Sequence, residues 1–171
     1  MRALLAWSFV VVTFTSLSCT PAAAAAPPSA ALVPKNPAAH VDGPLGAVVD
    51  AYDQLRFSLA HDDAVTAQHS AAALAAAAKA SSLSALAGHA EALAKVNAGK
   101  IDDERAAFSD VSKDFVQLLV DKPALQTGRT LFLCPMAKGY QKWVQTSAVL
   151  ENPFFGTAML DCGELQKSWS V

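Results

Sequence analysis

Apolar residues recur at helical spacing in four successive segments between residues 44 and 121, and this repetition is the strongest constraint on the fold. The first segment shows the pattern in Leu45, Val48, Val49, Tyr52, Leu55 and Leu59. The spacing predicts one helix over about 44–60, a second that either Asp62 or Asp63 can cap and that runs to about residue 80, a third over 82–98, and a fourth from near 101 to before Pro123. Because the connections between these segments are short, we expect the helices to pack as an antiparallel bundle.

The character of the chain changes after Gly128. Residues 130–133 indicate a short strand, and residues 142–150 indicate either a second strand or a helical turn. The alternation of apolar and polar residues is too short to predict a full sheet. We therefore expect an all-α fold, an antiparallel four-helix bundle with a small irregular C-terminal cap over about 128–165.

The N-terminus has the composition of a secretory leader. Arg2 precedes an apolar run over 3–12, and small residues follow up to the alanine tract that ends at Ala26. This order predicts a signal peptide over 1–26 and places the protein in the periplasm or cell envelope. A linker rich in proline and alanine then covers 27–43, and the folded domain covers 44–171.

Two outcomes of leader processing remain open. Cleavage within the alanine tract would release a soluble protein. The sequence Ser16-Leu17-Ser18-Cys19 also resembles a lipobox, which would leave a lipid anchor on Cys19. After cleavage of the leader, no remaining segment is long and apolar enough for a transmembrane span.

Charge and motif content exclude several functional classes. The formal net charge is −2 and Lys and Arg do not cluster, so nucleic acid is not an expected partner. The sequence has no CxxC motif, no glycine-rich phosphate loop and no GxSxG motif, so we do not expect an enzyme. The acidic pair Asp62-Asp63 and the acidic triplet Asp102-Asp103-Glu104 stand at predicted helix starts, where capping explains them.

Sulfur residues gather in the C-terminal cap. Cys134-Pro135-Met136 is followed by Met159-Leu160-Asp161-Cys162, although the whole chain has only three cysteines and three methionines. Thiolate and thioether sulfurs are soft donors that favour Cu(I), and by the same softness Ag(I), over hard cations. Cys134, Met136, Met159 and Cys162 are therefore the candidate metal ligands.

The same cysteines support a competing interpretation. In an exported protein, two cysteines 28 positions apart can form a Cys134–Cys162 disulfide. Closing that loop would stabilise the fold by roughly 3–4 kcal/mol on the chain-entropy model. The protein would then be a disulfide-stapled module that binds a protein partner and has no metal role.

The order of these motifs resembles the DUF3347 family. The residues that carry the resemblance are Tyr52-Asp53-Gln54-Leu55, Arg105-Ala106-Ala107-Phe108, Cys134-Pro135-Met136, Lys138-Gly139, Trp143, Asn152-Pro153-Phe154-Phe155-Gly156 and Met159-Leu160-Asp161-Cys162-Gly163. Such domains occur alone in exported bacterial proteins and fused to periplasmic adaptors of copper/silver efflux pumps. The resemblance thus implies soft-metal handling, with Cu(I) or Ag(I) as the bound ion and efflux components as partners.

Overall fold

The computed structural model describes residues 36–97, 99–147 and 149–171. The predicted signal peptide, Cys19 and the first part of the predicted linker lie outside these residues. The rest of that linker, residues 36–43, contains the short helix η1 (Pro37–Ala39) and contacts the folded domain. Asn36 donates a hydrogen bond to the carbonyl of Gly128, and Arg129 donates one to the carbonyl of Ala39.

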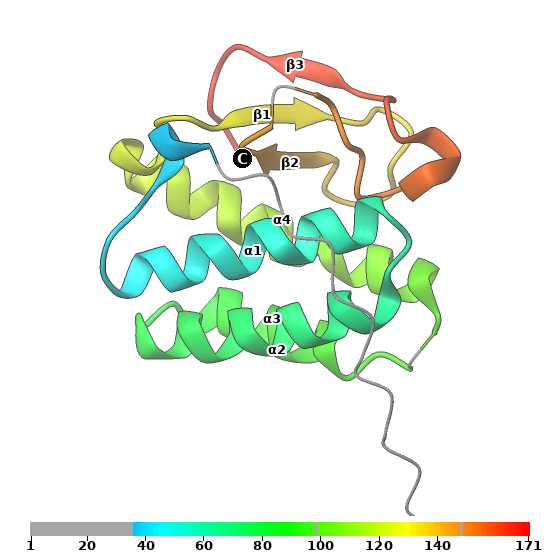
Figure 1. Ribbon diagram of the computed structural model, residues 1–171, viewed down its shortest axis with the longest axis horizontal. Helices are drawn as coiled ribbons and strands as arrows, with labels where there is room; N and C mark the ends of the chain where they lie inside the picture. Colours follow the sequence, from blue (N-terminus) through cyan, green and yellow to red (C-terminus); the bar gives the residue numbers. More distant parts are fainter. Residues whose placement is uncertain (1–35, 98, 148) are drawn as a thin grey trace, which may run out of the picture.

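The four predicted helices are confirmed in the described residues. They are α1 (Pro44–Ala60), α2 (Ala64–Ala80), α3 (Ser84–Ala94) and α4 (Ile101–Asp121). Helix α3 is shorter at both ends than the pattern predicted. In Figure 1, α1 and α4 lie between the C-terminal cap and the outer pair formed by α2 and α3.

Local sequence explains where the helices begin. Pro44 occupies the first turn of α1, where its missing N–H costs no hydrogen bond. Asp63 caps α2 by accepting a hydrogen bond from the backbone N–H of Thr66 at 3.0 Å. Three acidic residues, Asp102, Asp103 and Glu104, stand in the first turn of α4, where they complement the positive end of the helix dipole.

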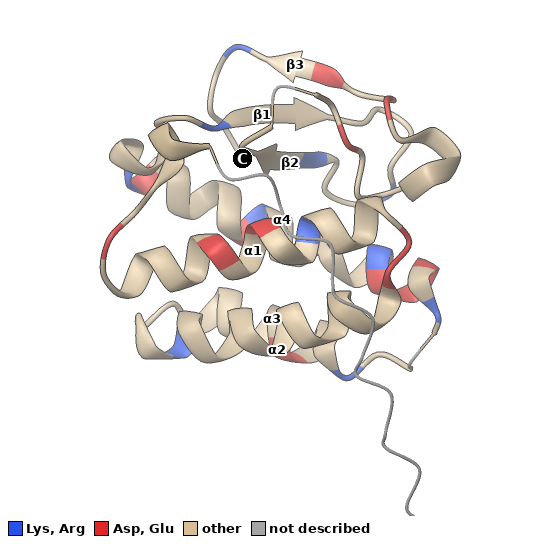
Figure 2. Ribbon diagram, in the orientation of Figure 1, with Lys and Arg blue, Asp and Glu red and all other residues tan. Residues whose placement is uncertain are grey.

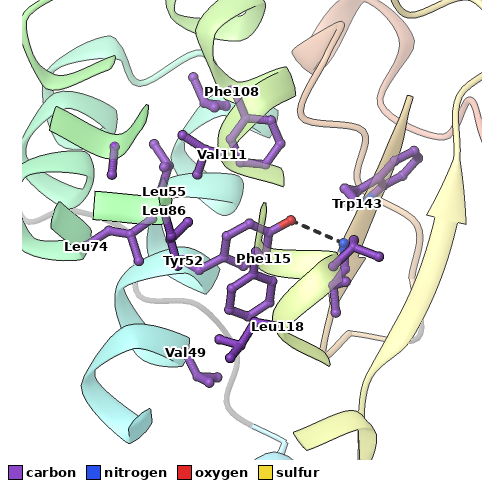
Figure 3. Close-up of a cluster of buried hydrophobic side chains, with 14 of the residues drawn as sticks. Val49, Tyr52, Leu55, Leu74, Leu86, Phe108, Val111, Phe115, Leu118 and Trp143 are labelled. Carbon is purple, nitrogen blue, oxygen red and sulfur yellow. Dashed lines mark hydrogen bonds between the residues drawn. The ribbon is translucent and has the colours of Figure 1, made fainter. Parts of the chain in front are cut away.

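The core joins the helices to the cap through aromatic rings. The rings of Tyr52 and Phe115 stack with centroids 3.6 Å apart, and Leu55, Leu74 and Phe108 pack around them. The hydroxyl of Tyr52 accepts a hydrogen bond from the backbone N–H of Val144, as Figure 3 shows. A tyrosine can supply both apolar area and a polar end, so it connects α1 to the cap without leaving an unsatisfied group.

The prediction of an all-α fold with an irregular cap is wrong. The cap contains a three-stranded antiparallel sheet in the order β2-β1-β3, built from β1 (Thr130–Leu133), β2 (Lys142–Gln145) and β3 (Glu164–Gln166). Strand β2 lies nearest α4, and β3 is the strand farthest from the helices (Figure 1). Strands of three or four residues are too short to show a period-2 pattern, and both Leu131 and Phe132 are buried.

Charged residues are spread over the part of the molecule that the structure describes. Figure 2 shows acidic and basic residues interspersed on the side facing the viewer, while α2 and α3 carry few charges. None of the helices in the described ranges has the length and apolar character that a bilayer-spanning segment needs.

Candidate functional site

The sheet register brings the two predicted cysteines together. Leu133 pairs with Glu164 at the end of the β1–β3 ladder; Cys134 directly follows Leu133, and Cys162 stands two residues before Glu164. Cys134 is fully buried, and its N–H donates a hydrogen bond to the carbonyl of Gln141 at 2.9 Å. Cys162 is half-buried, and its side chain lies within hydrogen-bonding range of the Cys134 thiol. Both thiols are free in the structure.

Each cysteine belongs to a tight turn that also holds a methionine. The N–H of Ala137 donates to the carbonyl of Cys134 at 3.1 Å, which closes a turn around Pro135 and Met136. The N–H of Cys162 donates to the carbonyl of Met159 at 3.1 Å and closes the second turn. The site therefore consists of two sulfur-bearing turns that meet at their cysteines.

Asn152 fixes the second turn in place. Its N–H donates to the carbonyl of Leu160 at 2.7 Å, and its side-chain amide donates to the carbonyl of Cys162 at 2.7 Å. Its side-chain oxygen accepts from the N–H of Phe154 at 2.8 Å. Because Asn152 is fully buried, these three hydrogen bonds are shielded from water. The sequence shows Asn152 only as the first residue of the motif Asn152-Pro153-Phe154-Phe155-Gly156.

The surroundings of Cys162 favour its protonated form. Burial raises the pKa of the Cys162 thiol, and the neighbouring Cys134 raises it further through charge repulsion and a hydrogen bond. Asp161 and Glu164 add to this effect. A thiolate is the nucleophile and the metal ligand, so Cys162 is a poor nucleophile and must release a proton to bind a cation.

The two methionines differ in exposure. Met136 is 57% exposed at the tip of the first turn, which is unusual for a large apolar side chain. Met159 ends the short helix η3 (Gly156–Met159) and is half-buried. The described residues include no group of three or more His, Cys, Asp or Glu side chains that could hold a metal ion. A cation at this site would thus depend on sulfur ligands.

An arginine below the cap holds three segments together. Arg105 donates to the carbonyl of Leu59 at 2.8 Å and forms an ion pair with Asp62. Thr157 donates from both its N–H and its hydroxyl to the same carboxylate. The two residues of the first acidic pair therefore have different roles. Asp63 caps α2, whereas Asp62 joins α4 to η3. The carboxylate contacts lower the pKa of Asp62, against the opposing effect of its partial burial.

A second buried arginine anchors the loop that precedes Asn152. The Arg56 side chain is 0% exposed, and it donates to a carboxylate oxygen of Glu151 at 3.1 Å. The other carboxylate oxygen of Glu151 lies 3.1 Å from Nε2 of His61. Sequence reasoning missed this cluster because Arg56 and Glu151 are 95 positions apart and neither belongs to a local motif.

The described chain is a helical domain with a small antiparallel cap that presents two adjacent cysteines. The family model described as "Protein of unknown function (DUF3347)" matches residues 48–126, and this match supports the assignment to that family that the sequence motifs suggest. The matched range contains all four helices except the first residues of α1, and it ends before Cys134. No curated protein and no solved structure matches the chain.

Proposed function

We propose that this protein binds Cu(I) or Ag(I) in the cell envelope and holds the ion between the sulfurs of Cys134 and Cys162. The observation that carries the proposal is the contact between these two side chains at the end of the β1–β3 ladder. Two thiolates suit a soft monovalent ion that accepts few ligands, and soft sulfur donors select Cu(I) over hard cations. Met136 and Met159 stand in the same turns and supply thioether sulfurs as further ligands.

The location and partners follow from sequence features rather than from the fold. The leader supports export to the periplasm, either in soluble form or with a lipid on Cys19. The family resemblance supports components of copper or silver efflux as partners. Mass spectrometry of the protein recovered from the cell envelope distinguishes the two forms, because acylation of Cys19 adds the mass of the lipid.

Metal binding is tested by Cu(I) titration against a chromophoric chelator under reducing conditions. We expect one Cu(I) per wild-type chain and a loss of at least 100-fold in affinity in Cys134→Ser/Cys162→Ser. Met136→Leu and Met159→Leu keep the apolar volume and remove one sulfur each, so they measure the thioether contribution. Equal and weak binding by wild type and the double cysteine variant would refute the proposal.

The same contact favours a second function, that of a disulfide-stapled protein-interaction module. Oxidation of the adjacent thiols would join the two sulfur-bearing turns and remove both thiolates from metal binding. A count of free thiols in protein isolated from the envelope without reductant tests this alternative. If both thiols resist alkylation until a reductant is added, the stapled form is the resident one; if both react at once, it is not.

A further inference from the structure

One glutamine side chain spans the first sulfur-bearing turn. The side-chain amide of Gln141 donates a hydrogen bond to the carbonyl of Pro135 at 3.1 Å and another to the carbonyl of Ala137 at 2.8 Å. These two residues stand on either side of Met136. A carboxamide nitrogen has two N–H groups, so both bonds can form at the same time. Gln141 therefore holds the chain before and after Met136.

The main chain of Gln141 holds Cys134 as well. Its carbonyl accepts the N–H of Cys134 at 2.9 Å, and the carbonyl of Cys134 accepts the N–H of Ala137 at 3.1 Å. Proline at position 135 restricts φ at the first corner of this turn. Both main-chain polar groups of Cys134 thus have partners, and its buried side chain lies within hydrogen-bonding range of Cys162.

The second sulfur-bearing turn is held in the same manner by another carboxamide. The side-chain amide of Asn152 donates to the carbonyl of Cys162 at 2.7 Å. Gln141 stands directly before β2, and Asn152 stands in the loop that follows β2. One carboxamide on each side of this strand therefore holds one turn, and the two free thiols meet without a covalent link.

The rest of the β1–β2 loop is anchored without the Gln141 side chain. The hydroxyl of Ser109 in α4 accepts the N–H of Tyr140 at 2.7 Å, and Leu133 pairs with Lys142 at the base of the loop. Removal of the Gln141 side chain should therefore leave the domain folded. Its effect should be confined to the first sulfur-bearing turn.

We propose that Gln141 is a positioning residue for the thiol pair, and that its side-chain amide holds the first turn in the conformation that keeps Cys134 in contact with Cys162. Groups that are held together beforehand lose less freedom when a bond joins them, so this amide should favour every reaction that needs both sulfurs at once. The proposal deepens the proposed function, but only its consequence for Cu(I) rests on that function.

The role is tested first on metal-free protein, by equilibration with glutathione and glutathione disulfide. One glutathione disulfide oxidises the two thiols to the Cys134–Cys162 disulfide and is itself reduced to two glutathione thiols. Because Gln141 is half-buried, we expect an effect near that of one net hydrogen bond, which is roughly fivefold in an equilibrium constant. The constant for disulfide formation should thus fall about fivefold in Gln141→Ala, which raises the reduction potential of the pair by about 20 mV.

Two further variants separate the hydrogen bonds of Gln141 from a general loosening of the cap. Gln141→Glu keeps the size of the side chain but replaces the donor amide with a carboxylate that can only accept, so its constant should fall at least as far. Gln166→Ala removes an amide of the same sheet that donates to the carbonyl of Glu164, outside both turns, and should behave as wild type. A normal constant in Gln141→Glu, or an equal fall in Gln166→Ala, would overturn the proposal.

The consequence for the metal is tested by Cu(I) titration of the same variants under reducing conditions. We expect Gln141→Ala and Gln141→Glu to lose roughly fivefold in Cu(I) affinity and Gln166→Ala to retain it. Unchanged Cu(I) affinity in both Gln141 variants would overturn the positioning role for the metal. If wild type itself fails to bind Cu(I), the proposed function is overturned, and the glutathione equilibrium still decides the role of Gln141.

Discussion

Gly156 lies directly against the guanidinium of Arg105, and a β-carbon at position 156 would overlap that group. The backbone of Gly156 also has φ of +59°, a conformation that favours glycine. The turn formed by residues 152–156 therefore closes over the arginine only because residue 156 has no side chain. This relationship ties the loop that carries Asn152 to the ion pair between α4 and the α1–α2 corner.

Gly156→Ala is expected to destabilise the protein by about 2 kcal/mol or more, because the arginine must move away from Leu59 and Asp62. Gly88→Ala is the matched control, since a β-carbon there meets nothing within 4 Å and the residue lies inside α3. That control should stabilise the protein by about 0.5–1 kcal/mol. Chemical denaturation measures both, and a Gly156→Ala protein as stable as wild type would contradict the packing described.

Asn152→Ala is expected to loosen the turn that holds Met159 and Cys162. It removes the two side-chain hydrogen bonds to Cys162 and Phe154 and leaves their buried partners unsatisfied, which costs about 2–3 kcal/mol. If the turn positions Cys162 for Cu(I), the affinity for Cu(I) should also fall under conditions in which the variant remains folded. A variant that loses stability but keeps its full Cu(I) affinity would limit Asn152 to a structural role.

Glu151→Ala should destabilise the fold by about 3 kcal/mol, because it leaves the buried guanidinium of Arg56 without this carboxylate. Glu91→Ala removes an ion pair with Lys95 at an exposed position of α3, and it should leave stability nearly unchanged because water screens that pair. Thermal denaturation of the two variants compares the pairs directly. If both substitutions reduce stability only slightly, the ion pair between Glu151 and the buried Arg56 contributes little to the stability of the fold.

Glu104 is expected to make stability fall as pH rises from acid to neutral. Burial raises the pKa of this carboxyl, although hydrogen bonding to Gln68 and the charge of Arg105 oppose the shift. A carboxyl with a raised pKa in the folded state favours folding while protonated, and this contribution is lost as pH rises through the folded pKa. Glu104→Gln should therefore gain stability over wild type between pH 4 and pH 7.

Asp103→Asn serves as the control for this prediction. Asp103 is exposed in the same helical turn, where its negative charge favours the N-terminus of α4, so its loss should cost about 0.3–1 kcal/mol at pH 7. The two amide variants are thus expected to change neutral-pH stability in opposite directions. A loss of stability at pH 7 in Glu104→Gln would contradict the assigned effect of burial.

The proposed metal site predicts a steep pH dependence of Cu(I) affinity. Both thiols must lose a proton on binding, and the raised pKa of Cys162 keeps this thiol protonated at neutral pH. Below the thiol pKa values, the apparent association constant should rise by about 100-fold per pH unit in wild type, from the release of two protons. In Cys162→Ser it should rise by about tenfold, and equal slopes would show that Cys162 is not a thiolate ligand.

The sequence alone was sufficient to predict the four helices and to identify the residues of the two sulfur motifs. Helical spacing of apolar residues extends over several turns, so Val48, Tyr52 and Phe115 indicate their elements without knowledge of the rest of the fold. Proline at position 44 and the two aspartates at positions 62 and 63 mark helix starts for equally local reasons, and the structure shows that Asp63 is the one that caps α2. The sheet was not predicted because its strands are too short to show an alternating pattern. Strand β3 has three residues, and in β1 the successive residues Leu131 and Phe132 are both buried.

Only the tertiary structure decided how distant residues meet. The β1–β3 register places Cys134 beside Cys162, and no local pattern encodes a pairing over 28 positions. The contact of Arg56 with Glu151 spans 95 positions and depends on the packing of the loop against α1. Local propensity acts over a few residues, and the sequence therefore determined the helices and the soft-donor chemistry of the cap. Packing of the whole chain determined that two thiols and a buried asparagine come together in one place.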